Sequence, residues 1–317
     1  MERKSFLGID FGGTKINFVL IKSREIIYKT KAPTGKIYSG KDIVEKLVLE
    51  IKNIEERTSI IPSAVGIGLA GMVDHKKGRV VFLPNIGKIK DFPFTENLSE
   101  KIELPVFLEN DVNTALIGEA QIGVAQNKED VIFIAIGTGI GGAILISHKL
   151  YTGKNGLAGE IGHITVQENG LLCNCGKRGC LETVASGSGI ERYVRKRIEK
   201  GEETKIKKQE ITAEKIAEFA KQGDKLAIKA YTRASHYIGK VCGGLVNIFD
   251  PEMIILGGGV TESGLILKGV KKEIRKYALP ALLKDTEIVT SILKNDAGAI
   301  GAAFLAQLNE SGKNIYA

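Results

Sequence analysis

A strand, a glycine-rich turn and a second strand occur twice in this sequence, and this repeat constrains the fold more than any other feature. Residues 6–10 and 16–21 are predicted strands joined by residues 11–15, and the same layout returns in residues 131–136, 137–141 and 142–146. Glycine permits positive φ and close approach of the backbone to a ligand. The repeat therefore predicts two related lobes, each with a turn of the size that holds a phosphate.

The second turn has an alternative interpretation. Gly137, Gly139 and Gly142 match the G-x-G-x-x-G dinucleotide fingerprint, but that motif requires a helix after the glycines. Here four apolar residues follow, at 143–146, and they predict a strand, so a Rossmann site is disfavoured. Two interpretations stay open on the residues alone. The turns hold phosphate from two sides through backbone N–H groups and the hydroxyls of Thr14 and Thr138, or they are purely structural hairpins.

Strands and helices alternate along the first half of the chain. A helix is predicted near residues 42–57, strands at 64–69 and 106–108, and a helix at 112–122. A long helix follows with a core face formed by Leu226, Ala230, Ala234, Tyr237, Val241 and Leu245, then a buried strand at 253–256 and a closing helix at 297–308. Small residues in the closing helix would allow close approach, which we interpret as packing between two lobes. This order predicts an α/β fold.

The length and net charge of the chain limit the classes of protein to which it can belong. A chain of 317 residues predicts about two domains. The net charge of +8 and pI near 9.1 raise the question of nucleic-acid binding, but no basic stripe interleaved with aromatic residues is present, so we expect a solvated lysine-rich surface and no nucleic-acid partner. The first residues lack a signal-peptide core, and glycines interrupt the uncharged stretch 131–147. We therefore expect a cytoplasmic protein without a membrane partner.

Asn110 and Asp111 follow a predicted strand and immediately precede a predicted helix. Open α/β sheets bind ligands at this end of their strands. Asp111 is therefore a candidate general base that accepts a proton from a substrate hydroxyl, while Asn110 orients the substrate. The alternative is that Asp111 only caps the helix, and the local sequence leaves both interpretations open.

One imidazole and three thiols occur at His163, Cys173, Cys175 and Cys180. This set matches the Cys₃His preference of tetrahedral Zn²⁺, and four protein ligands leave no position for a reactive water. We therefore predict a structural zinc ion, with buried free cysteines as the alternative. Glu160 and Glu182 flank the cluster, so the metal would hold two carboxylates in fixed positions.

Together these motifs resemble the ROK family of sugar kinases and repressors, within the actin-like ATPase superfamily, over nearly the whole chain. Residues 7–15 resemble the first phosphate motif of the family, residues 136–142 the second, and Gly257, Gly258 and Gly259 the adenosine motif. Residues 159–163 and 173–182 resemble its sugar and zinc signature. The resemblance implies an α/β actin-like ATPase (ribonuclease H-like) fold of two lobes with a cleft between them. The small lobe would be 1–108 plus 302–317, and the large lobe 109–301 with the zinc knuckle.

The resemblance also implies an activity, namely ATP-dependent phosphorylation of the 6-hydroxyl of a hexose, with Asp111 as the base. Asn110, Glu160, His163 and Glu182 would hold ring hydroxyls, and Gly71 and Asn85 would lie in a loop that closes over the sugar. One ring nitrogen of His163 would bind zinc while the other reaches the sugar. Asp10 would lie near Mg²⁺, and the ATP-binding residues would be Gly12, Gly13, Thr14, Lys15, Gly137, Thr138, Gly139, Gly257, Gly258 and Gly259.

Glucose is the expected hexose, with fructose, mannose and N-acetylmannosamine as alternatives. A sugar-responsive repressor is disfavoured, because the family's repressors carry an N-terminal helix-turn-helix and the first phosphate motif here begins near residue 7. Family members are often dimers or tetramers, so we expect a homo-oligomer.

Overall fold

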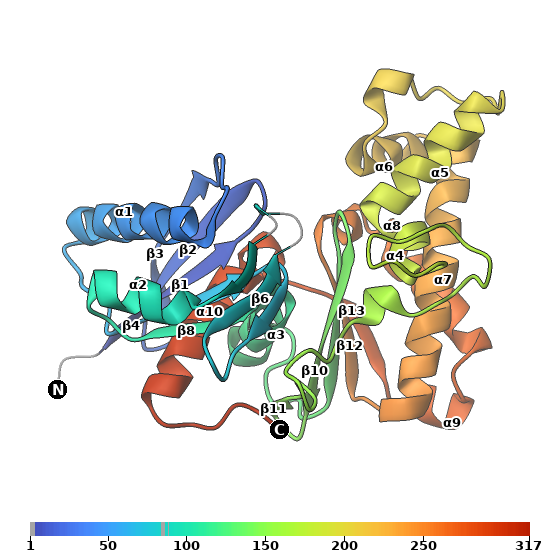
Figure 1. The fold of residues 1–317 in the computed structure, drawn as a ribbon. Helices are drawn as coiled ribbons and strands as arrows, with labels where there is room; N and C mark the ends of the chain where they lie inside the picture. The colour runs from blue at the N-terminus through green and yellow to red at the C-terminus, as the bar shows by residue number, and fades with distance from the viewer. Residues whose placement is uncertain (1–3, 84–85, 88) are drawn as a thin grey trace. The chain divides into compact units, whose positions relative to one another are not determined.

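The computed structural model describes residues 4–83, 86–87 and 89–317. The chain divides into two compact units (Figure 1). The first comprises residues 1–127, 143–158 and 295–317, and the second residues 128–142 and 159–294. These bounds differ from the predicted lobes. The difference at residues 109–127 arises because the helix there packs against the closing helix and a strand of the first unit.

A mixed five-stranded sheet forms the centre of the first unit, in the order β3-β2-β1-β4-β8. Its strands are β1 (Ser5–Phe11), β2 (Lys15–Lys22), β3 (Glu25–Pro33), β4 (Ala64–Leu69) and β8 (Val106–Asn110). β1, β2 and β3 pair antiparallel, whereas β1, β4 and β8 run parallel. The carboxyl ends of these three parallel strands therefore lie at one edge of the sheet, where ligands bind in open α/β sheets.

Helices and a small second sheet complete this unit. The helices are α1 (Gly40–Thr58), α2 (Phe94–Ile102), α3 (Asp111–Ile122) and α10 (Ala297–Glu310), and the small sheet contains β5 (Met72–Asp74), β6 (Arg79–Leu83) and β7 (Ile89–Phe92). A Ser39 and Asp42 capping box begins α1, and the apolar face of α1 joins the buried core of the sheet. The predicted helices at 42–57 and 112–122 are confirmed, with ends shifted by one or two residues.

The small residues of α10 serve a purpose different from the predicted one. A Cβ atom on Gly8 of β1 or on Gly66 of β4 would collide with the backbone of α10, and one on Gly301 would collide with the carbonyl of Thr114 in α3. The close packing of α10 is thus against β1, β4 and α3 inside the first unit. The interpretation of this helix as packing between lobes is wrong in that respect, because a glycine pattern shows close approach without naming the partner.

The second sheet has the order β11-β10-β9-β12-β13. Its strands are β9 (Val131–Ile136), β10 (Ile140–Ile146), β11 (Lys149–Leu150), β12 (Met253–Gly257) and β13 (Glu287–Thr290). β9, β12 and β13 run parallel, with Ala135 of β9 opposite Gly257 of β12. The predicted strand at 131–136 is confirmed, and the chain passes from the second unit to the first within β10.

The helices of the second unit include one 25-residue helix, α7 (Lys225–Phe249). The others are α4 (Leu181–Ala185), α5 (Gly187–Glu199), α6 (Ala213–Lys221), α8 (Leu265–Glu273) and α9 (Pro280–Leu283), with 3₁₀ turns η1 (Ile161–His163), η2 (Lys208–Glu210), η3 (Gly259–Ser263) and η4 (Ile274–Lys276); η5 (Lys294–Asp296) spans the division between the units. Five of the six predicted core residues of α7 are buried. Tyr237 is half-buried instead, and its hydroxyl accepts a hydrogen bond from Gln167. Within the described part of the chain, no helix is both long and apolar enough to cross a bilayer.

Candidate functional site

The first glycine turn joins β1 to β2 at an exposed hairpin tip. The N–H of Gly12 donates to the carbonyl of Lys15 (3.1 Å), and Thr34 fixes the turn by donating from its hydroxyl to the carbonyl of Gly12 (2.8 Å) and from its N–H to that of Thr14 (3.1 Å). Gly12 and Gly13 do not adopt positive φ. Glycine instead leaves open space at this turn, because a Cβ atom on Gly13 would have no other atom within 4 Å. The backbone of Gly13 is therefore open to a ligand.

Asp10 is half-buried near the carboxyl end of β1. Its Oδ2 accepts a hydrogen bond from Asn17 (2.9 Å), and Gly298 at the start of α10 lies so near that a Cβ there would be 2.9 Å from Asp10 Cγ. Burial raises the pKa of Asp10, while the Asn17 hydrogen bond and the charges of Lys15 and Lys31 act in the opposite direction. A divalent cation would further favour the ionised carboxylate, so Asp10 fits the predicted place near Mg²⁺.

The start of α3 resolves which residue caps this helix. The side-chain oxygen of Asn110 accepts from the N–H groups of Val112 (2.9 Å) and Asn113 (3.2 Å), so Asn110 is the N-cap and Asp111 is the first helical residue. The interpretation that Asp111 merely caps the helix is therefore wrong. Asp111 is half-buried directly after the carboxyl end of β8, where open α/β sheets bind ligands.

Two glycines place this helix start against its neighbours. The side-chain amide of Asn110 donates to the carbonyl of Gly71 (3.1 Å), which links the loop after β4 to the start of α3. Gly68 of β4 lies beneath the same turn, and a Cβ there would lie 3.3 Å from the Cα of Asp111. Asn110, Asp111 and Gly71 are thus brought together, whereas Asn85 lies outside the described residues.

A buried group behind Asn110 was not predicted. Glu109 is fully buried, and its Oε1 accepts from the N–H of Asn110 (2.8 Å) and the side chain of Asn113 (2.9 Å). Its Oε2 lies 3.8 Å from His75 Nδ1, and the His75 ring stacks on Tyr316 with centroids 4.1 Å apart. Burial raises the pKa of Glu109 against the effect of these hydrogen bonds. The available signal was a charged residue directly after the strand predicted at 106–108.

The second glycine turn joins β9 to β10. The N–H of Gly137 donates to the carbonyl of Gly139 (3.0 Å), and the carbonyl of Gly137 accepts from Gly187 at the start of α5 (2.8 Å). Thr138 is exposed, and a Cβ on Gly137 would meet no atom within 4 Å. A Cβ on Gly139 would instead collide with the carboxylate of Glu182. The turn therefore leaves its backbone open on one side and holds Glu182 on the other.

The third glycine group lies at the same sheet edge, because β12 runs parallel to β9 and ends beside it. Gly258 has a φ of +86°, and a Cβ there would lie 2.5 Å from the carbonyl oxygen of Ile136. A Cβ atom on Gly257 would collide with the ring of Phe133, whereas a Cβ atom on Gly259 would have no other atom within 4 Å. The second unit thus brings the predicted phosphate and adenosine residues to one edge.

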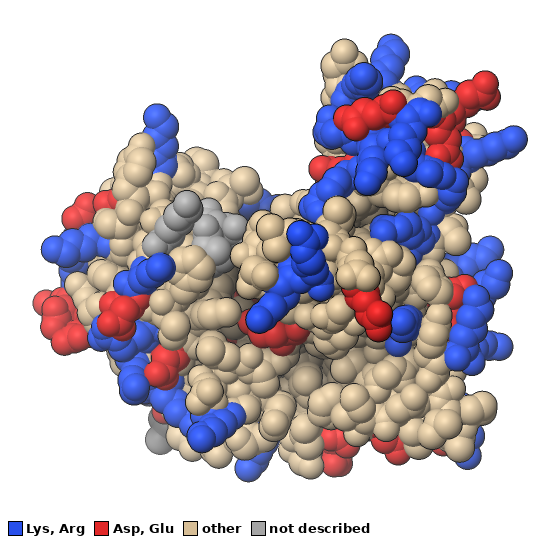
Figure 2. All heavy atoms as spheres, turned by 45° about the vertical axis from the view of Figure 1, so that its right-hand side comes forward, with Lys and Arg blue, Asp and Glu red and all other residues tan. Residues whose placement is uncertain are grey.

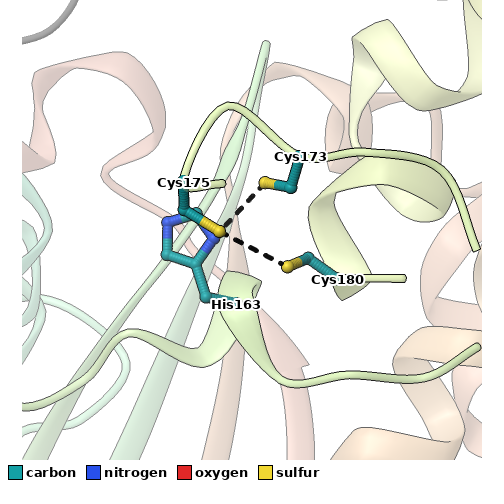
Figure 3. A group of neighbouring side chains, drawn as sticks. All are labelled: His163, Cys173, Cys175 and Cys180. Carbon is teal, nitrogen blue, oxygen red and sulfur yellow. Dashed lines mark hydrogen bonds between the residues drawn. The ribbon is translucent and has the colours of Figure 1, made fainter. Parts of the chain in front are cut away.

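The predicted zinc ligands converge (Figure 3). One ligand atom from each of His163, Cys173, Cys175 and Cys180 lies within 4.8 Å of all the others. The Sγ of Cys173 is 3.7 Å from His163 Nδ1, and those of Cys175 and Cys180 are 3.6 Å apart. Tetrahedral Zn–S bonds of about 2.3 Å separate two sulfurs by about 3.8 Å. The four side chains therefore fit a zinc ion with little rearrangement.

The environment of the cluster explains why it suits a cation. Burial raises the pKa of the Cys180 thiol to about 12, and the neighbouring thiols act in the same direction. Burial also raises the pKa of Cys173, whereas a backbone hydrogen bond at Lys177 lowers that of Cys175. Three thiolates at such short separations repel one another, so a divalent cation is needed to hold them all ionised.

Both predicted carboxylates adjoin this cluster. His163 Nε2 lies 3.7 Å from Glu160, so the ring directs Nδ1 towards the thiols and Nε2 away from them. Glu182 Oε2 accepts from the N–H of Ile140 (3.0 Å), and Oε1 accepts from the Cys173 thiol (3.7 Å). The second unit thus gathers Glu160, His163 and Glu182 around the metal ligands.

Comparison with known protein families matches residues 6–309 to the ROK family. The chain belongs to the ROK family. The resemblance drawn from the sequence motifs is thereby confirmed.

Individual relatives of this ROK protein include enzymes and regulators. It is 34% identical to a glucokinase of Thermotoga maritima, over 96% of this chain and 97% of that one. It is 31% identical to a xylose repressor of Caldicellulosiruptor bescii, over 94% of this chain and 76% of the repressor. Among solved structures, a ROK family glucokinase from Streptomyces griseus in complex with glucose and AMPPNP superposes with a TM-score of 0.84, at 34% identity and over 96% and 99% of the two chains. The predicted actin-like ATPase fold class is confirmed.

Proposed function

We propose that this ROK protein transfers the γ-phosphoryl group of ATP to the 6-hydroxyl of a hexose, with glucose as the foremost substrate. The observation that carries the proposal is the cap of α3. Asn110 caps the helix, and Asp111 is therefore the first helical residue, directly after the carboxyl end of β8, where open α/β sheets bind ligands. The glucokinase relatives support the same activity.

In this mechanism Asp111 accepts the proton of the attacking sugar hydroxyl. Proton acceptance makes the oxygen a better nucleophile as it bonds to the γ-phosphorus and the bond to the β-phosphate oxygen breaks. Asn110 orients Asp111 by fixing the first turn of α3, and its remaining amide hydrogen is the group we assign to the sugar. Glu109 supports this arrangement through its bond to the N–H of Asn110.

We assign the other ring hydroxyls to Glu160, His163 and Glu182 on the second unit. The carboxylate of Glu160 is half-exposed and accepts hydrogen bonds from hydroxyl groups. His163 Nε2 points away from the thiols, so the ring can bind zinc through Nδ1 and a hydroxyl through Nε2. Gly71 and Asn85 are proposed to lie beside the sugar as well.

ATP is proposed to bind the three glycine groups. The backbones at Gly13, Gly137 and Gly259 leave open space that phosphate or ribose oxygens can enter, since a side chain at any of them would fill that space. The hydroxyls of Thr14 and Thr138 and the amine of Lys15 are exposed beside two of these backbones. Bound Mg²⁺ would neutralise charge on the phosphates, with Asp10 as the residue that holds it.

Zinc is proposed as a structural ion held by His163, Cys173, Cys175 and Cys180. Its positive charge and fixed ligands would set the orientation of the His163 ring and of the adjoining carboxylate of Glu182. The domain boundaries, cytoplasmic location and homo-oligomeric state given above stay predictions.

A substrate panel tests the proposal. Purified protein with ATP and Mg²⁺ is assayed for ADP release with glucose, fructose, mannose and N-acetylmannosamine, and the position of the new phosphate is read by ³¹P and ¹³C NMR. We expect the highest kcat/KM with glucose and phosphorylation at the 6-hydroxyl. Absence of turnover with all four sugars, together with sugar-dependent, sequence-selective binding in a DNA gel-shift assay, would replace the kinase by a repressor function.

A further inference from the structure

A basic pocket lies on the second unit, outside the residues assigned to ATP, sugar and zinc. Its volume is about 510 Å³, within the size range of small-molecule sites. Six of its lining residues are cations, namely Arg178, Arg192, Lys196, Arg197, Lys200 and Arg233, and no carboxylate is among the described residues that line it. Figure 2 shows many lysine and arginine side chains on the upper part of the molecule, where Figure 1 places α5 and α6, with some Asp and Glu side chains among them.

Three of these cations form one stripe along α5 and its end. Arg192, Lys196 and Lys200 are spaced four residues apart, so they lie on the same side of the helix. All three are exposed. Like charges at this spacing repel one another, and among the residues that the structure describes none of the three forms an ion pair with a carboxylate. The three cations therefore present one positive edge that an anion could contact.

Arg233 of α7 forms another part of the pocket wall, and several contacts hold its side chain in place. Arg233 of α7 donates to the carbonyl of Val184 (3.0 Å), and its guanidinium lies 5.0 Å from the ring centre of Tyr193 and 5.2 Å from that of Tyr237. Burial lowers the pKa of Arg233, which reflects a cation held away from water without a carboxylate. Arg197 is the exception, since it is paired with Glu202.

Apolar surface adjoins this charge. The side chain of Leu171 is 42% exposed and lines the same pocket beside Arg178. A pocket that held only a simple anion would need no such surface. Arginine forks match phosphate oxygens geometrically, and lysines supply further charge.

We propose that this pocket binds a small phosphorylated molecule, with its phosphoryl group on Arg192 and Lys196 and its organic part against Leu171. The site is separate from the three glycine groups. It is connected to them through α5, whose first residue, Gly187, donates to the carbonyl of Gly137. A ligand here would therefore lie along α5, from Gly189 to its end, and the first residue of this helix contacts the second glycine turn.

Binding is tested by calorimetric titration of the zinc-loaded, full-length protein with inorganic phosphate, glucose 6-phosphate and AMP in separate experiments. The variants are Arg192→Glu and Lys196→Glu. The matched control is Arg195→Glu, which makes the same charge change at an exposed position of α5 that does not line the pocket. Circular dichroism confirms folding, and Arg192→Gln replaces Arg192→Glu should that variant not fold.

We expect glucose 6-phosphate or AMP to bind more tightly than inorganic phosphate, and which of the two binds more tightly identifies the organic part. Loss of one charge-assisted contact should raise Kd about tenfold or more in the two pocket variants, with less than about a twofold change in Arg195→Glu. Equal weakening in all three variants would indicate only a long-range charge effect and overturn the site. No binding by any probe, or binding that the pocket variants leave unchanged, would overturn it too. Glucose 6-phosphate and AMP can also bind the proposed sugar and ATP sites, but that binding is the same in all three variants. The site is therefore judged from the difference between the pocket variants and Arg195→Glu.

Discussion

Replacement of Asp111 with asparagine separates catalysis from folding at the start of α3. The substitution keeps the size of the side chain and removes its charge and its capacity to accept a proton. Asn110 remains as the N-cap, with its two hydrogen bonds to the first turn intact. A base that contributes through proton transfer typically supplies a factor of about 10² to 10⁴ in rate. We therefore expect kcat of Asp111→Asn to fall by about that factor.

The effect on stability should be small by comparison. A carboxylate in the first turn of a helix gains about 0.3–1 kcal/mol from the helix dipole, which corresponds to a fall in Tm of no more than about 4 °C. Asn110→Ala is the opposite case, because it removes the cap and the bond to Gly71. Loss of such a cap costs about 0.5–2 kcal/mol, so its Tm should fall further than that of Asp111→Asn.

The assay measures kcat and KM for glucose and ATP by coupled ADP release, alongside thermal unfolding. Asp285→Asn serves as the control, since this carboxylate is 80% exposed and far along the sequence from the proposed base. ATP affinity of Asp111→Asn is measured separately by titration and should be near that of the parent. Turnover of Asp111→Asn close to the parent value, at normal stability, would refute the assignment of the base.

Four further predictions follow from particular contacts. Metal analysis should find about one zinc ion per chain. Zinc affinity should fall as the pH falls, because protons compete with the metal for thiols such as Cys180, where burial raises the pKa to about 12. A fully active protein without zinc would contradict the structural role of the ion. Gly13→Val should weaken ATP binding with little change in Tm, since the added atoms enter open space, and unchanged nucleotide affinity would count against the phosphate turn. Gly301→Ala should lower the free energy of unfolding by about 1–3 kcal/mol or more, because the new Cβ collides with α3. Gly244→Ala lies in an open position of α7 and should raise the free energy of unfolding by up to about 1 kcal/mol. Equal Tm changes in the two variants would show that the space around the Cβ does not decide the outcome. Burial raises the pKa of Glu109, so ionisation of this carboxyl group favours the unfolded chain. The Glu109→Gln variant should therefore gain stability relative to the parent as the pH rises above about 4.5. Chemical unfolding of both proteins at several pH values would check this difference.

Helices and strands whose hydrophobic pattern and caps are local can be predicted well from the sequence. The helix with a Ser39 and Asp42 capping box and the strands at Ala64–Leu69 and Val131–Ile136 were predicted within one or two residues, because apolar periodicity and caps depend on neighbours along the chain. The Cys₃His group was predicted for a similar reason, since its three cysteines are close in sequence and the ligand chemistry of zinc is restrictive.

Other features depended on contacts that no local pattern specifies. The partner of the small-residue face of α10 could not be inferred, since a glycine such as Gly301 records that something approaches and not what approaches. The glycines of the two turns were expected to permit positive φ, yet Gly13 and Gly137 have ordinary φ and leave space instead. Both interpretations require knowing which atoms surround the missing Cβ.

The sequence by itself determined the α/β class, the order of the glycine turns, the Cys₃His set and the pair Asn110 and Asp111, since each depends on residue type and spacing. Only the tertiary structure decided which of that pair caps α3, that Glu109 lies buried against His75, and that the cations of α5 share a pocket with Arg233 of α7. The physical reason is that the energies of hydrogen bonds and burial depend on distances and angles that the order of residues does not state. For Glu109 and for the pocket these contacts also join segments distant along the chain.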